Sequence, residues 1–205
     1  ALELDPSKAH TDTYIYLKKT KPLLQAIKKY KFDAAIGGSR RDEEKSRAKE
    51  RFFSVRNEFG VWDPKNQRPE LRHLYNSELK EGDSMRIFPL SNWTEYDVWL
   101  YIRKENIQVV PLYFAKTYNL IERNNILLRV DKLTQPIEKE TVITATARYR
   151  SLGCSPSTGA VLSNATTVDE IINELKQATV SERETRAIDH SSDSAMESKK
   201  KEGYF

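Results

Sequence analysis

Hydrophobic residues recur at helical spacing in three stretches of the chain, and each stretch has a threonine near its start. Threonine is a common N-cap, because its hydroxyl accepts a hydrogen bond from a free backbone N–H of the first turn. The pattern predicts helices over residues 20–30, 91–106 and 166–178, with Thr20 capping the first and Pro22 in its first turn. In the other two, an acidic residue three positions after the threonine completes a capping box. These pairs are Thr94 with Asp97 and Thr167 with Glu170.

Short apolar runs between these helices predict strands. The run "FDAAIGG" (residues 32–38) ends in two glycines and is typical of a buried parallel strand that leads into a tight turn. The run "SMRIFPL" (residues 84–90) predicts a second strand. Residues 126–133 and 141–150 alternate like strands, and we consider a hairpin arm there. Residues 61–76 carry two prolines and little periodicity, which predicts a surface loop.

The composition is typical of a water-soluble globular protein. The 205 residues are enough to bury a core, and 31% of them are charged against 38% hydrophobic. No apolar run approaches the roughly 18–20 residues that cross a bilayer, and the first residues show no secretory pattern. One cysteine, Cys154, and three scattered histidines argue against a disulfide framework and a Cys-rich or His-based metal site. We therefore expect a cytoplasmic protein that contacts no membrane.

Cations gather in one stretch although the formal net charge is only +4. Residues 39–51 hold six Lys/Arg and four Asp/Glu directly after Gly37 and Gly38. If residues 40–51 formed a helix, three like-charge pairs would stand four positions apart, each costing about 0.2–0.5 kcal/mol. A stretch that binds an anion tolerates this cost, because the anion removes the repulsion. The alternative is a solvated charged helix, and the pattern leaves both open.

Guanidinium groups match phosphate and sulfate oxygens, so the cations of this stretch are the first candidates for an anion site. The two glycines would let a ligand approach the backbone at the carboxyl end of the predicted strand, where open α/β sheets bind ligands. The candidate residues are Gly37, Gly38, Arg40, Arg41, Lys45, Arg47 and Arg51.

Three further places could contribute to a site. Arg148 and Arg150 lie on one side of a predicted strand before a glycine turn, and could close over an anion or be two exposed arginines. Asn92 and Trp93 could contact a base or a sugar, although aromatic residues at helical spacing usually belong to the core. Cys154 is more typical of a small buried residue than of a nucleophile, because no candidate base is adjacent in the sequence.

Several long motifs occur in order along the chain. They are "FDAAIGGSRRDEEKSRAKER" (32–51), "WDPKNQRPEL" (62–71), "RIFPLSNWTEYDVWLYI" (86–102), "RYRSLGCSPSTGAV" (148–161) and the final segment ending in "KKKEGYF" (181–205). Together they resemble the small subunits of bacterial sulfate adenylyltransferases, from about residue 20 to Phe205. The wider group is the adenine nucleotide alpha-hydrolase-like superfamily, which includes the phosphoadenylylsulfate reductases.

The resemblance implies an α/β fold: the C-terminal part of a Rossmann-like parallel sheet with flanking helices, plus an irregular C-terminal extension. Residues 1–110 would be the remaining part of the nucleotide-binding domain. Residues 111–180 would form a subdomain with a strand arm and a helix, and residues 181–205 a polar tail.

The resemblance also implies a reaction, in which ATP and sulfate give adenylyl sulfate and pyrophosphate. On this basis we expect catalytic roles for Arg40, Arg41 and Arg47, and nucleotide contacts from Asn92 and Trp93. Mg²⁺ is expected with ATP, but no residue can be assigned to it. Sulfate and phosphate oxygens would be bound by Gly37, Gly38, Lys45, Arg51, Arg148 and Arg150.

In this family a GTPase large subunit partners the small subunit. The polar tail would then be ordered by that partner or by the nucleotide. Two alternatives stay open. A reductase of phosphoadenylylsulfate is disfavoured because no cysteine follows Cys154, and a non-catalytic remnant could retain partner binding. We do not expect nucleic acid as a partner, because the aromatic residues sit at core spacing rather than between the cations.

The chain departs from the family in one respect. The family has a pyrophosphate loop resembling S-x-G-K-D-S on its first strand-to-helix turn, and this motif does not occur in the 205 residues. The arginine half of the site is therefore present without the phosphate-loop half. We expect that this chain alone cannot adenylylate sulfate, and that residues 32–38 expose apolar surface where neighbouring strands are missing.

Overall fold

The computed structural model describes residues 11–43, 45–67, 70, 75, 78–178, 181–182 and 203. The chain divides by compactness into two units, and each is described by itself. The first unit contains residues 12–93 and 192–205, and the second contains residues 1–11 and 94–191. This division groups residues by contact alone, so the boundaries expected at residues 110 and 180 stay predictions.

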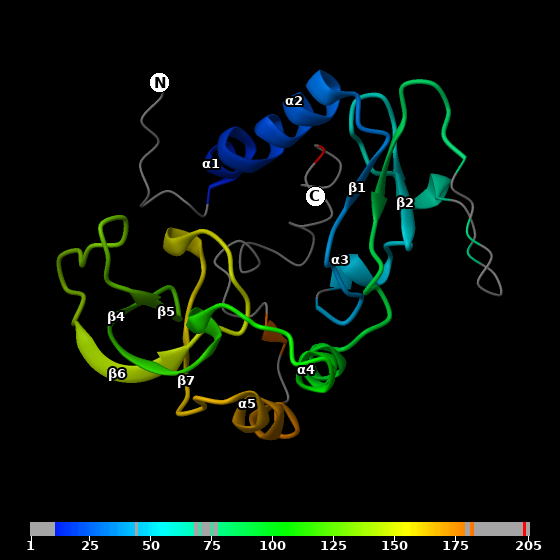
Figure 1. The fold of residues 1–205 in the computed structure, drawn as a ribbon. Coiled ribbons are helices and arrows are strands. Elements are labelled where there is room, and N and C mark those ends of the chain that lie inside the picture. Colours follow the sequence, from blue (N-terminus) through cyan, green and yellow to red (C-terminus); the bar gives the residue numbers. More distant parts are fainter. Residues whose placement is uncertain are drawn as a thin grey trace. The chain divides into compact units, whose positions relative to one another are not determined.

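The first unit combines helices with a three-stranded sheet, in which the strand order is β1-β3-β2. β1 runs parallel to β3, and β2 runs antiparallel to it (Figure 1). This is the α/β class that the family resemblance implies. The elements are α1 (Asp12–Ile15), a π-helical turn (Tyr16–Thr20), α2 (Lys21–Tyr30), β1 (Ala34–Ile36), α3 (Lys45–Ala48), β2 (Phe53–Arg56), a 3-10 turn (Pro64–Asn66) and β3 (Ser84–Ile87).

Helical structure begins earlier than predicted in the first unit. α1, the π-helical turn and α2 follow one another without a break, so Thr20 has helical dihedral angles and its side chain makes no capping hydrogen bond. The predicted N-cap at Thr20 is therefore wrong. Pro22 does lie in the first turn of α2, and Lys31 ends the helix in the left-handed conformation with φ of 54°.

β1 is an edge strand rather than the buried strand that its sequence predicts. It pairs with β3 on one side, and no strand of the described part of the chain pairs with its other side. Ile36 is consequently 73% exposed. The prediction of burial is wrong, whereas the expectation of exposed apolar surface at this strand is confirmed.

One face of the three-stranded sheet is polar although it is buried. The register pairs Ser54 with Arg86 and Arg56 with Ser84, so these four side chains share a face. All four are buried, and both arginines are fully inaccessible to solvent. Buried strand faces are usually apolar, so two arginines here need specific partners.

The second unit contains a four-stranded antiparallel sheet with strand order β5-β4-β6-β7, together with two longer helices. Its elements are α4 (Glu95–Lys104), a 3-10 turn (Pro111–Tyr113), β4 (Lys116–Arg123), β5 (Ile126–Arg129), β6 (Ile143–Arg148), a 3-10 turn (Ser155–Ser157), β7 (Val161–Leu162) and α5 (Val168–Leu175).

Both predicted capping boxes are present in the second unit. The Thr94 hydroxyl accepts a hydrogen bond from Asp97 N–H at 3.1 Å, and the Asp97 carboxylate accepts one from Thr94 N–H at 2.8 Å. Thr167 and Glu170 make the same exchange at the start of α5. α4 and α5 pack together through a core around Trp99, joined by Ile171, Ile172 and Leu175.

The hairpin of this sheet differs from the one considered from the sequence. β5 pairs with β4, through a turn in which Asn124 and Asn125 both have positive φ. β6 pairs with the other side of β4, so β5 and β6 are separated by a strand. The sequence analysis missed β4, whose side chains follow no regular alternation in burial.

Among the residues that the structure describes, no helix is both long enough and apolar enough to span a membrane. The expected irregular extension, residues 181–205, lies outside the described residues apart from Ser181, Glu182 and Gly203.

Candidate functional site

The carboxyl ends of β1 and β3 meet the amino end of β2 at one edge of the three-stranded sheet. Gly37 N–H donates a hydrogen bond to Ile87 O at 2.9 Å, which extends the β1–β3 ladder by one residue. A Cβ placed on Gly38 would meet no heavy atom within 4 Å, so the space beside this glycine is open. Ligands of open α/β sheets bind outside the carboxyl ends of parallel strands, and this edge is therefore the candidate site.

The arginine loop, residues 39–51, begins directly after Gly38. It turns at residues 41–43 and then forms a short helix, α3. This agrees with the predicted loop that leads into a helix. A single helix over residues 40–51 does not form. The like-charge face that such a helix would create is consequently absent from the loop as the structure describes it.

Two arginines of this loop share one carboxylate of the same loop. Arg40 Nη1 lies 3.4 Å from Glu43 Oε1, and Arg47 Nε lies 3.4 Å from Glu43 Oε2. Arg40 also reaches Asp42 at 3.3 Å, and Arg47 donates to the Ser39 hydroxyl. Both arginines are buried, so the loop neutralises part of its own charge and these two side chains hold its shape.

Arg41 connects the loop to three other parts of the first unit. Its Nη1 donates to Asn92 Oδ1 at 2.8 Å, and its Nη2 donates to Glu70 Oε2 at 3.3 Å. Its Nε donates to the backbone oxygen of Glu50 at 3.2 Å, and the guanidinium lies 5.1 Å from the centre of the Phe52 ring. The Arg41 side chain is 32% exposed, so its outer face stays accessible while every nitrogen is engaged.

Glu70 is a site residue that the sequence analysis missed. Its carboxylate accepts hydrogen bonds from Phe53 N–H at 2.9 Å and from Phe52 N–H at 3.0 Å, in addition to the bond from Arg41. It thereby fixes the end of the arginine loop at the start of β2. No sequence pattern points to this role, because Glu70 lies in a stretch predicted only as a surface loop.

A buried ionic cluster on the polar face of the sheet was also missed. Arg56 Nη2 lies 2.6 Å from Glu50 Oε1, and Arg56 Nη1 donates to the Ser54 hydroxyl at 2.6 Å. Burial, and then the positive charge of Arg56, lowers the pKa of Arg86 to about 10, so Arg86 stays charged at neutral pH. The available signal was one arginine within each of two short strand-like runs, "FSVR" and "SMRI".

Arg51 differs from the other arginines of the loop. It is half-buried and its Nε is inaccessible to solvent, yet it makes no hydrogen bond or ion pair with any residue of the described ranges. It directly precedes Phe52, whose oxygen accepts from Phe88 N–H at 2.9 Å, so it lies at the same sheet edge as Gly38. The backbone of Lys45 begins α3, but its side chain lies outside what the structure describes.

The remaining candidates of the first unit are Asn92 and Trp93. Asn92 is exposed, and its Oδ1 accepts the hydrogen bond from Arg41. Trp93, the next residue in the chain, is half-buried. Their expected contact with a nucleotide stays a prediction.

Arg148 and Arg150 belong to the second unit and are not the two exposed arginines that one interpretation expected. Arg148 is buried, with Nε and Nη2 each 2.9 Å from Glu174 Oε2 on α5. Arg150 Nη2 lies 2.6 Å from Glu95 Oε2 at the start of α4. Both side chains therefore hold helices within their unit, and an anion contact by either one stays a prediction.

The chemistry available at the candidate site is charge stabilisation of an oxyanion. The edge offers open space beside Gly38, a guanidinium on Arg51 that no residue of the described ranges engages, and the accessible face of Arg41. Within the described ranges, no group of three or more His, Cys, Asp or Glu side chains could hold a metal ion. Cys154 is half-buried in a loop of the second unit.

Comparison with protein families gives one match that covers most of the chain. The family model of the phosphoadenosine phosphosulfate reductase domain matches residues 1–160.

Curated proteins with high sequence identity are named as sulfate adenylyltransferase subunits. "Sulfate adenylyltransferase subunit 2" of Parabacteroides distasonis is 55% identical over 200 residues, which is 97% of this chain and 65% of that protein. "Sulfate adenylyltransferase subunit 2 2" of Marinobacter nauticus is 54% identical over 200 residues, 97% of this chain and 64% of that protein. "Sulfate adenylyltransferase subunit 2" of Sulfurimonas denitrificans is 55% identical over 200 residues, which is 97% of this chain and 65% of that protein. The chain thus spans 64–65% of the length of these relatives.

Proposed function

Because the chain belongs to the phosphoadenosine phosphosulfate reductase domain family, we propose that it acts as part of a sulfate adenylyltransferase. The reaction would form adenylyl sulfate and pyrophosphate from ATP and sulfate. The observation that carries this proposal is the 54–55% identity, over 97% of the chain, to proteins with that name. The arrangement at the carboxyl edge of β1 and β3 supports it, because cations and open space meet there.

In this reaction an oxygen of sulfate attacks the α-phosphorus of ATP. The bond from that phosphorus to the oxygen bridging toward the β-phosphorus breaks, and pyrophosphate leaves with the electron pair. Both substrates are anions, so positive groups are needed to bring them together and to stabilise the charge that develops on the leaving group. The protein supplies this through arginines held in fixed positions.

We assign different tasks to the arginines of the loop. Arg40 and Arg47 are positioning residues, because both are buried against Glu43. Arg41 is a positioning residue that keeps an accessible face, because its nitrogens are committed to Asn92, Glu70 and Glu50. Arg51 is the group that would bind sulfate or pyrophosphate, beside the open space at Gly38.

Magnesium would enter this site with the nucleotide. The described residues contain no cluster that could hold a metal ion by itself. Mg²⁺ in nucleotide enzymes is bound largely by substrate phosphates and water, so the ion would be carried by the ATP polyphosphate. Its contribution would be to neutralise that polyphosphate.

A partner subunit is part of the proposal. The name "subunit 2" of the relatives describes those proteins as components of a larger enzyme. We propose that this chain likewise works beside another subunit, and that the partner is a GTPase. The phosphate-loop motif is not among the 205 residues, so the polyphosphate half of the site would come from protein outside these residues.

The test is sulfate-dependent release of pyrophosphate from ATP by the natural protein, purified from its own cells with the chains that accompany it. The same protein with Arg51→Gln is compared with Arg103→Gln, because Arg103 is 52% exposed and pairs only at the surface of the second unit. We expect Arg51→Gln to lower kcat/KM by about 100-fold or more, as the loss of an oxyanion-stabilising group does. Arg103→Gln should leave it unchanged.

The outcomes separate the two parts of the proposal. No sulfate-dependent pyrophosphate release by the natural complex would overturn the adenylyltransferase assignment. Normal release by the Arg51→Gln variant would leave that assignment intact and overturn only the role of Arg51.

A further inference from the structure

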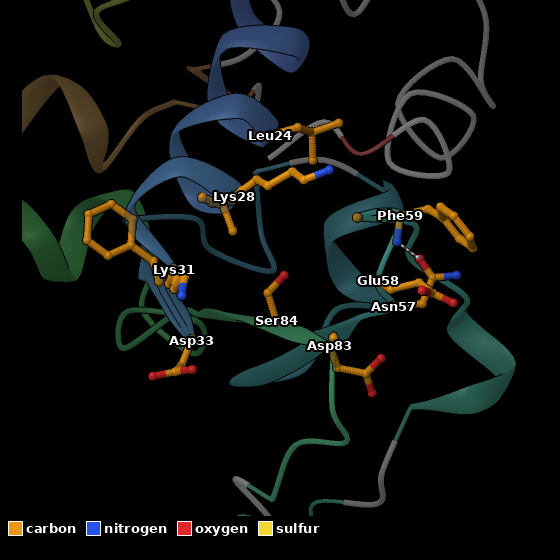
Figure 2. A pocket seen from close by; sticks show the side chains of 13 residues that line it. Leu24, Lys28, Lys31, Asp33, Asn57, Glu58, Phe59, Asp83 and Ser84 are labelled. Atoms are coloured by element: carbon orange, nitrogen blue, oxygen red, sulfur yellow. Dashed lines mark hydrogen bonds between the residues drawn. The ribbon is translucent and has the colours of Figure 1, made fainter.

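A hollow lies in the first unit, at the end of the sheet opposite the arginine loop. Its volume is about 570 Å³, which is within the range of sites that accept small molecules or side chains. It opens between α2 and the turn after β2, beside Asp33, which precedes β1, and Ser84, which begins β3. Figure 2 shows Leu24 and Lys28 extending from α2 above the hollow, with Glu58 and Phe59 on the turn that faces them.

The walls of this hollow combine apolar and acidic groups. Leu24, Ile27, Phe32 and Phe59 supply the apolar surface. This surface is poorly covered, because Phe32 is 52% exposed and Phe59 is 70% exposed. Three carboxylates and two lysines also line the hollow: Asp33, Glu58, Asp83, Lys28 and Lys31.

A glycine from the far end of the chain lies against this wall. Gly203 is buried, and a Cβ placed on it would lie 3.0 Å from Leu24 Cδ1 and 3.5 Å from Gly60 O. Its φ of 94° lies in the left-handed region that favours glycine. A Cβ on Gly60 would in turn clash with Leu24 Cδ2. Two glycines therefore allow the chain near residue 203 to approach α2 closely, at residues that line the hollow.

The sequence on either side of Gly203 complements the hollow. Tyr204 and Phe205 follow it, and two residues of extended chain reach about 7 Å, enough to enter a hollow whose wall Gly203 already contacts. Three lysines precede it at residues 199–201, and the lining carries three carboxylates against two lysines, which leaves an excess of negative charge for them. We infer that this hollow is the docking site of the chain's own segment 199–205, with the two aromatic side chains inside and the lysines toward its carboxylates.

This docking differs from the expectation that a partner or the nucleotide orders the tail. It would fasten the tail to the first unit independently of either one. Leaving one large aromatic side chain without its pocket should lower the ratio of docked to free tail by about tenfold or more. Placing an alanine at residue 203 should also release the tail, because the left-handed conformation and the contact with Leu24 both disfavour a Cβ.

Limited trypsin digestion with mass spectrometry measures the docked fraction, through the rate of cleavage after Lys199, Lys200 and Lys201. We expect cleavage to be more than about tenfold faster when Tyr204→Ala and Phe205→Ala are combined in the natural protein, because free tail is the form that is cut and each aromatic side chain contributes to docking. Gly203→Ala should have a similar effect with both aromatic residues retained. Tyr101→Ala, which removes a 45% exposed tyrosine from α4, should change nothing. Equal rates in all four proteins would overturn the inference.

Methyl NMR then locates the tail. The Ile27 and Leu24 methyl signals should shift in the Phe205→Ala variant, because an aromatic ring leaves their surroundings, and the shift should not vary with protein concentration. Unchanged methyl signals would show that the tail does not enter this hollow, which overturns the inference. Signals that vary over about a hundredfold range of concentration would show that a second copy supplies the tail, which also overturns the inference.

Discussion

The Arg56 guanidinium lies 2.6 Å from the Glu50 carboxylate, and both side chains are buried on the polar face of the three-stranded sheet. Glu50 is also the last residue but one of the arginine loop, and its backbone oxygen accepts a hydrogen bond from Arg41. The ion pair therefore holds the end of the arginine loop against β2 on the buried face of the sheet. It also offsets the charge of Arg86, which is fully buried nearby.

Replacing Glu50 with glutamine should destabilise the first unit strongly. The variant leaves Arg56 and Arg86 charged and buried without the carboxylate, and breaking a buried pair in this way costs about 3–5 kcal/mol. Urea unfolding followed by circular dichroism measures the loss. Glu105→Gln is the matched control, because its contact with Lys104 is 3.9 Å long and exposed, and its loss should cost less than about 0.5 kcal/mol. Equal stability of the two variants would contradict the buried cluster.

Replacing Glu70 with glutamine should loosen the arginine loop. The carboxylate accepts from two backbone N–H groups and from Arg41, and hydrogen bonds to a charged group contribute about 1.5–3 kcal/mol. We expect a lower unfolding free energy and faster amide hydrogen exchange at Phe52 and Phe53. Glu81→Gln provides a control for the loss of one negative charge from a residue exposed on the surface. Unchanged exchange at both amides would show that Glu70 does not hold the loop.

Replacing Glu174 with glutamine should affect the second unit without weakening anion binding. Arg148 is buried against this carboxylate. Loss of the carboxylate charge should lower the unfolding free energy by about 1–3 kcal/mol, because solvent at the partly exposed Glu174 screens part of the interaction. Asp169→Asn, whose partner Arg103 is exposed, should cost almost nothing. Calorimetry measures the stability and titration with inorganic pyrophosphate measures the binding. Weaker pyrophosphate binding at unchanged stability would instead favour the anion role expected for Arg148.

The pair of Arg123 and Glu140 should make the stability of the second unit depend on acid. Hydrogen bonds from Arg123 hold the pKa of Glu140 below its usual range. The folded state therefore keeps this carboxylate ionised at a pH where the unfolded chain binds a proton. The resulting stabilisation is fully present above about pH 5 and is lost as pH falls through the lowered pKa.

Urea unfolding of the natural protein and of Glu140→Gln, between neutral pH and about pH 3, checks this dependence. The difference in unfolding free energy should be constant near neutral pH and should shrink in acid. A difference that stays constant down to the lowest pH would show that the charge of Glu140 does not contribute.

Removing the Thr167 cap should weaken α5 by a modest amount. Its hydroxyl accepts from Glu170 N–H at 3.3 Å, and substituting an N-cap threonine with alanine typically costs about 1 kcal/mol. Thr141→Ala, at an exposed loop position, is the control. The melting temperature measures both, and equal values would show that the capping box does not stabilise the helix.

The sequence by itself determined the features whose partners lie a few residues apart. The capping boxes at Thr94 and Thr167 are examples, since each pairs residues three positions apart. The strand at residues 84–87 and the loop leading into a helix after Gly38 were predictable for the same reason. The glycine pair and the neighbouring arginines also marked the sheet edge at which the candidate site lies.

Only the tertiary structure decided which arginines are committed to other residues. Arg41 is held by Glu70, 29 residues away, and by Asn92, 51 residues away. Arg148 is paired with Glu174 on a helix that follows it by 26 residues. The exposure of β1 depends in the same way on which strands lie beside it. A guanidinium looks the same in the sequence whether it is free or paired, because its ion pair depends on where the fold places the carboxylate.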